Sequence, residues 1–195
     1  MDLNKTDRNI IIDIDNYKNK YLNDPIFTKY VIEFSEKGGA TAFLTNNFTN
    51  FKILKESTSL PVFFEVDRQF NGIINIDPEF LIIDIVNFDG IYEQLNEFLN
   101  GIRDKFKGKI IGKIFNKKQA ILACKLYLDG ILIDVSENNF DKDFIAEIYF
   151  DINISVILRI KSLDINSCKD LVKIGINYFI LGEDITNPNK ILSKI

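Results

Sequence analysis

The sequence predicts an α/β protein, a compact (β/α)8 (TIM) barrel built as a single domain over residues 1–195. Three observations predict this fold: short apolar runs rich in Ile, Val and Phe, longer segments of helical period between them, and an uncharged face along the runs. Eight strand–helix units in 195 residues leave about 24 residues for each unit, so the chain is shorter than the ~250 residues typical of such barrels. We therefore expect short loops.

The expected strands are eight apolar runs, each shorter than a typical helix. No low-complexity linker or block of like charges interrupts them, which favours one domain. The strands are expected at 9–15, 40–45, 61–67, 80–86, 109–115, 129–135, 154–160 and 177–182.

The expected helices carry apolar residues at i, i+3 and i+4, the spacing that gives a helix one apolar face. Ile91, Leu95 and Phe98 illustrate this spacing. The helices are expected at 25–37, 48–57, 90–106, 116–127, 139–149, 164–173 and 187–194.

Composition excludes several classes of function. The net charge is −4 with both signs interspersed, so the chain has no basic stripe that would select a nucleic-acid backbone. It has no signal-peptide-like start and no apolar run of ~18 residues, so we expect a soluble, cytoplasmic protein that does not bind membranes. Histidine is absent, which excludes every site built on imidazole. Cys124 and Cys168 are expected to be reduced thiols, and no cofactor or metal is expected.

Alternation along the strands separates two faces, because successive side chains of a strand point to opposite sides. One face is apolar throughout, as in Ile10, Ile12 and Ile14, and is expected to lie under the helices. The other face is expected to line the barrel lumen and to place its polar residues toward the C-terminal rim, where barrel enzymes hold their chemistry. Those polar residues are Asp13, Asp15, Glu65, Asp67, Asp84, Lys113, Asp134, Arg159 and Lys161.

Two interpretations of these nine residues remain open. Barrel lumens can hold ion networks that serve only the structure. Many charged groups converging on one rim also indicate a binding site.

Several short motifs resemble the N-acylmannosamine-6-phosphate 2-epimerases, which are compact barrels of the ribulose-phosphate-binding group. The resemblance runs over nearly the whole chain in matching order and spacing. The motifs are Gly38-Gly39-Ala40, Leu60-Pro61-Val62, Asp67-Arg68-Gln69-Phe70, Ile76-Asp77-Pro78, Asp84, and Gly182-Glu183-Asp184-Ile185-Thr186-Asn187-Pro188.

The resemblance also shows where this chain departs from the family. Asp67 stands at the position of the family's catalytic Lys, and Arg159 stands at that of its catalytic Glu. In the family, that Lys and that Glu remove and return the proton at C2 of the open-chain sugar phosphate. An Arg cannot act as a general base at neutral pH.

The substrate-contacting positions depart from the family as well. Arg68, Asp84 and Gly182 match it, and Glu183 and Asp184 bring negative charge into the expected phosphate loop. Arg159 and Lys161 are the best cations for an anionic ligand. The remaining departures from the family's polar residues are Asp15, Leu44, Lys113 and Asn187.

The leading hypothesis is therefore a divergent barrel that is inactive or altered as an epimerase and binds a small anionic ligand or a protein partner. The alternative is an active sugar-phosphate epimerase or isomerase with a relocated catalytic pair, Asp84 and Lys113, on adjacent strands. A third hypothesis places Mg²⁺ among the carboxylates of the rim, although the neighbouring basic residues favour ion pairs. The resemblance adds a homodimer as an expectation. The expected ligand-binding residues are Asp15, Asp67, Arg68, Asp134, Arg159, Lys161 and Gly182.

Overall fold

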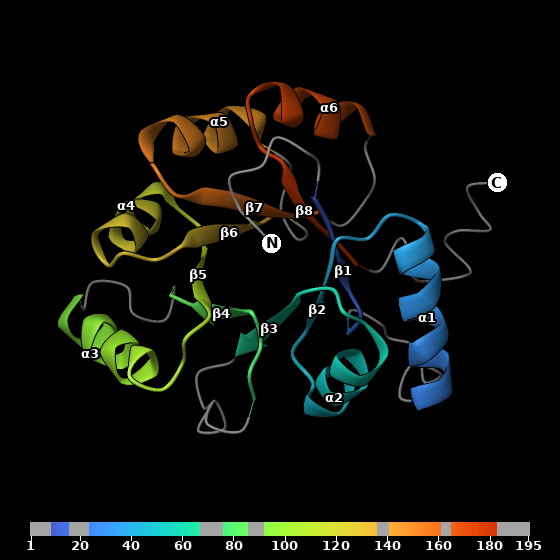
Figure 1. Ribbon diagram of the computed structural model, residues 1–195. Coiled ribbons are helices and arrows are strands. Elements are labelled where there is room, and N and C mark those ends of the chain that lie inside the picture. The colour runs from blue at the N-terminus through green and yellow to red at the C-terminus, as the bar shows by residue number, and fades with distance from the viewer. Residues whose placement is uncertain are drawn as a thin grey trace.

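All eight predicted strands are present in the computed structural model, and they close into a parallel barrel in sequence order, with β8 pairing with β1 (Figure 1). The structure describes residues 9–15, 24–66, 76–85, 92–135, 141–160 and 165–182. The strands are β1 (Asn9–Asp13), β2 (Ala42–Thr45), β3 (Val62–Val66), β4 (Phe80–Asp84), β5 (Lys109–Ile114), β6 (Gly130–Asp134), β7 (Ser155–Ile160) and β8 (Tyr178–Leu181).

Helices surround the barrel on its outer side (Figure 1). Six of the seven predicted helices fall in the described residues, and the seventh, expected at 187–194, lies outside them. They are α1 (Pro25–Lys37), α2 (Phe48–Ser57), α3 (Tyr92–Arg103), α4 (Lys117–Lys125), α5 (Lys142–Asp151) and α6 (Ile165–Lys173). Among them, none is long and apolar enough to cross a membrane.

Side-chain caps fix where several helices begin. Asp24, Asn47 and Asp141 each accept hydrogen bonds from backbone N–H groups in the first turn of α1, α2 and α5. At α4, the Asn116 side chain accepts a hydrogen bond from the Gln119 backbone N–H, and the Gln119 side chain accepts one from the Asn116 backbone N–H. This reciprocal pair is a capping box. The caps satisfy N–H groups that have no partner within their own helix.

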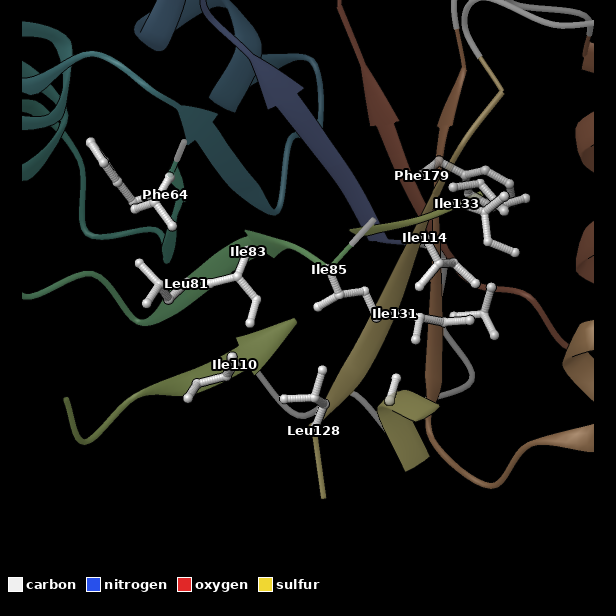
Figure 2. Close-up of a cluster of buried hydrophobic side chains, with 14 of the residues drawn as sticks. Phe64, Leu81, Ile83, Ile85, Ile110, Ile114, Leu128, Ile131, Ile133 and Phe179 are labelled. Atoms are coloured by element: carbon white, nitrogen blue, oxygen red, sulfur yellow. The ribbon is translucent and has the colours of Figure 1, made fainter. Parts of the chain in front are cut away.

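Two separate apolar clusters confirm the predicted division of the strand faces. The larger cluster lies between strands and helices and includes Leu81, Ile83, Ile131 and Ile133 (Figure 2). The smaller cluster fills the lumen, and we call it the lumen floor. It consists of Ile11, Ala42, Leu44, Phe63, Phe80, Ile82, Ile111, Leu132, Ile157, Tyr178 and Ile180.

Gly175 is required by the turn that joins α6 to β8. Its φ of +108° lies in the left-handed region, and the N–H groups of Gly175 and Ile176 bond carbonyls in the last turn of α6. A Cβ at this position would come within 2.2 Å of the Tyr149 hydroxyl on α5. Backbone conformation and packing therefore both favour glycine here.

We predict that Gly175→Ala lowers the free energy of unfolding by about 2–3 kcal/mol, because strain at positive φ adds to the clash with Tyr149. Urea denaturation measures this change. Gly101→Ala is the matched control, since a Cβ there meets nothing within 4 Å inside α3. It should stabilise the protein by about 0.5–1 kcal/mol. Equal effects from the two substitutions would contradict this account.

Candidate functional site in the barrel lumen

A layer of charged side chains stands on the lumen floor. Each member follows a floor residue by two positions on the same strand, so its side chain points to the same face. We call this layer the lumen charge cluster. It consists of Asp13 on β1, Glu65 on β3, Lys113 on β5, Asp134 on β6 and Arg159 on β7.

Arg159 lies at the centre of the cluster and is buried. Its Nη1 donates to Asp134 Oδ2 at 3.0 Å, and its Nη2 donates to Glu65 Oε2 across the lumen. Its Nε lies 3.7 Å from Asp13 Oδ2, which is too far for a hydrogen bond, and has no hydrogen-bond acceptor among the described residues. Three carboxylates on three other strands therefore surround one guanidinium.

Lys113 is the second cation of the cluster and is paired with two of the same carboxylates. Its Nζ lies 3.2 Å from Glu65 Oε1 and 3.4 Å from Asp134 Oδ2. The cluster thus holds three carboxylates and two cations. Its own groups largely neutralise one another, and any excess charge is negative.

The pKa values reflect this crowding. Burial raises the pKa of Asp13 to about 6, and the more distant Arg159 only partly opposes it. Burial also acts to raise the pKa of Glu65, but Arg159 and Lys113 outweigh it and hold that pKa below its usual value. For Arg159, burial acts to lower the pKa, but the carboxylates outweigh it and keep the guanidinium charged.

Asp15 takes a different role from the other predicted lumen carboxylates. Its Oδ2 accepts a hydrogen bond from Thr45 Oγ1 at 2.6 Å, and its Oδ1 accepts one from Asn50 Nδ2 at 2.7 Å. The backbone N–H groups of Asn46 and Asn47 donate to Oδ2 as well. This carboxylate therefore fastens the β2–α2 loop to the end of β1.

The other predicted site residues lie at the ends of their strands or outside the described part. Asp84 ends β4 and is the register partner of Lys113 on β5, so the expected pair lies on adjacent strands. Gly182 follows β8 directly. Asp67, Arg68 and Lys161 lie outside the described residues.

Two members of the cluster, Asp13 and Glu65, are among the polar residues expected on the lumen face but not among the expected ligand-binding residues. Strand alternation already placed both on the lumen face, so the signal was present in the sequence. The family resemblance gave neither of them a role. Among the described residues, no group of three or more Cys, Asp or Glu side chains is arranged to hold a metal ion.

Comparison with known proteins supports the fold. No protein-family model matches the sequence. The structure is similar to N-acetylmannosamine-6-phosphate 2-epimerase from Clostridium perfringens, with a TM-score of 0.77 and 18% identity over 95% of this chain and 91% of that one. It is also similar to thiamine phosphate pyrophosphorylase from Pyrococcus furiosus, with a TM-score of 0.60 and 15% identity over 99% of this chain and 96% of that one. Likeness at these identities shows a (β/α)8 barrel and leaves activity to be argued from the site.

We predict that Asp13→Asn stabilises the protein relative to wild type increasingly as the pH rises. The folded-state pKa of Asp13, about 6, lies above its ordinary 3.8, so the folded state binds this proton more tightly than the unfolded chain does. Ionisation of Asp13 should therefore remove about 3 kcal/mol of stability between about pH 4 and pH 8, a loss that the neutral amide avoids.

Urea unfolding of both proteins across this pH range measures the difference. Asp104→Asn is the control, since Asp104 is exposed and outside the lumen. A pH-independent effect of Asp13→Asn would contradict the assignment.

Proposed function

We propose that this protein is a divergent barrel of the sugar-phosphate epimerase type that binds a small ligand at the mouth of its lumen and has lost proton transfer at C2 of a hexosamine phosphate. The ligand is expected at the C-terminal ends of the strands, where (β/α)8 barrels hold their sites.

The position of Arg159 carries this proposal. The family resemblance expects a Glu here, whose carboxylate would exchange a proton with C2 of the sugar. A guanidinium offers only N–H donors and stays protonated at neutral pH. Arg159 is moreover buried among Asp13, Glu65 and Asp134, so it acts as the centre of an ion network rather than as a base.

Residues at the expected substrate contacts also support the loss of epimerase activity. Leu44 stands where the resemblance expects an Arg, and its side chain is part of the apolar lumen floor. Asp15 stands where a Gln is expected, and it accepts hydrogen bonds from the β2–α2 loop. The sequence-based expectation of an anionic ligand then rests on Arg68 and Lys161, because Arg159 is already paired with carboxylates.

The alternative is an active sugar-phosphate epimerase that uses Asp84 and Lys113. One observation favours it: these residues are register partners on β4 and β5, and their strands end at the catalytic rim of such barrels. Against it, the Lys113 ammonium contacts Glu65 and Asp134, two members of the ion network.

Deuterium exchange at C2 of N-acetylmannosamine 6-phosphate in D2O, followed by proton NMR at high protein concentration, tests the proposal. Exchange detects removal of the C2 proton even when net turnover is slow. We expect broadening of the sugar resonances, which reports binding, without exchange above a protein-free control.

Exchange that disappears in Asp84→Asn and persists in Asp104→Asn would contradict the proposal and establish the alternative. Absence of both broadening and exchange would contradict binding of a sugar phosphate by this protein. The ligand would then belong to another chemical class.

A further inference from the structure

Tyr127 has a backbone conformation that ordinarily belongs to glycine. It follows the end of α4, and its φ of +55° lies in the left-handed region. Its N–H donates a hydrogen bond to the Cys124 carbonyl and so closes the last turn of the helix. Among the described residues, the corresponding turns after α1 and α6 hold Gly39 and Gly175 at positive φ. A tyrosine therefore occupies a turn position at which this chain elsewhere uses glycine.

Packing within the chain does not explain this tyrosine. The Tyr127 side chain is 86% exposed, although its neighbours Leu126 and Leu128 are buried. The ring thus adds little to the core, while the left-handed backbone costs conformational energy for any residue that has a Cβ. Residues held in such conformations cluster at functional sites. An exposed and strained tyrosine therefore indicates a contact outside the chain's own fold.

The loop that contains Tyr127 lies against the loop that joins α3 to β5. Arg103, the last residue of α3, donates hydrogen bonds to the carbonyls of Leu126 and Tyr127. Helices α3 and α4 are neighbours in the ring around the barrel (Figure 1). Both loops lie at the N-terminal ends of the strands, on the side of the barrel away from the lumen mouth. The connections beside them, which enter β4 and β7, also belong to the described residues.

The same two loops carry exposed lysines that form no ion pair with any other described residue. Lys105 and Lys107 stand on either side of Phe106, whose buried side chain anchors the α3–β5 loop. Lys125 is the last residue of α4. By contrast, Lys37 on α1 is exposed and pairs with a glutamate one turn away. We call the following residues the Tyr127 surface: Lys105, Lys107, Lys125 and Tyr127.

We propose that the Tyr127 surface binds an acidic segment of a partner protein. Carboxylates of the segment pair with Lys105, Lys107 and Lys125, and an apolar side chain of the segment packs on the Tyr127 ring. Complementary charge selects the partner, and tyrosine is among the residues that contribute most to protein interfaces.

Two acidic residues in the same loops favour a protein segment over a continuous polyanion. Asp104 and Asp129 are exposed, and the Asp129 carboxylate accepts a hydrogen bond from the Ile110 N–H. A nucleic-acid backbone or an anionic bilayer presents negative charge along its whole length, so it would be repelled by both aspartates. A peptide can place its backbone N–H groups opposite the aspartates and its carboxylates opposite the lysines.

The variant Tyr127→Gly separates a role in binding from a role in folding. Glycine adopts the left-handed turn without strain, so we expect this variant to unfold at the same urea concentration as wild type or at a higher one. A clear loss of stability in Tyr127→Gly would overturn the proposal, since the ring would then serve the fold.

A random peptide library selected on immobilised wild-type protein supplies the probe for binding. We expect the selected peptides to be rich in Asp and Glu and to contain an apolar residue. Fluorescence anisotropy with these peptides should show an affinity about tenfold lower or more for Tyr127→Gly and for Lys107→Glu. Lys118→Glu is the matched control, because Lys118 is also an exposed lysine without an ion pair among the described residues, at the opposite end of α4 from Lys125.

Selected peptides without net negative charge would overturn the proposal, as would affinities that Tyr127→Gly and Lys107→Glu leave unchanged. Single-stranded thymidine oligonucleotides and phosphatidylglycerol vesicles are tested beside the peptides. Binding of either one that exceeds peptide binding and is lost in Lys107→Glu would overturn the proposal in favour of a nucleic acid or a membrane.

Discussion

Burial of the Arg159 guanidinium is the constraint on which the rest of the lumen depends. A buried charge is costly unless opposite charges and hydrogen bonds surround it. Here Asp13, Glu65 and Asp134 supply them from three different strands, and Lys113 balances two of those carboxylates. The contacts cross the barrel from β7 to β3, so the network is satisfied only when the barrel is closed.

The same network determines what the lumen can do. Proton transfer beside a carbonyl needs a base that is free to accept the proton at the reacting carbon. Each cation of the cluster contacts at least two carboxylates, and the most deeply held of them is Arg159.

The sequence predicted the barrel and the two strand faces because both follow from local periodicity. Apolar runs alternate with helical segments, and each strand's alternation decides which residues enter the lumen. Pairing within the lumen could not be predicted in the same way. Glu65 and Arg159 are 94 residues apart, and their contact depends on barrel closure and side-chain reach. Strand alternation places Asp15 on the lumen face as well, yet its carboxylate accepts hydrogen bonds from the β2–α2 loop. The path of a loop does not follow from a repeating sequence pattern.

A double-mutant cycle between Arg159 and Glu65 tests the central claim most directly. The free energies of unfolding of wild type, Arg159→Met, Glu65→Gln and the double variant would be measured near pH 8. The account predicts a coupling energy of about 2–3 kcal/mol, because either single change leaves a buried charge without its partner. A matched cycle with Glu79→Gln should be additive, since Glu79 pairs with Lys55 instead. Additivity between Arg159 and Glu65 would contradict the claim that their ion pair organises the lumen.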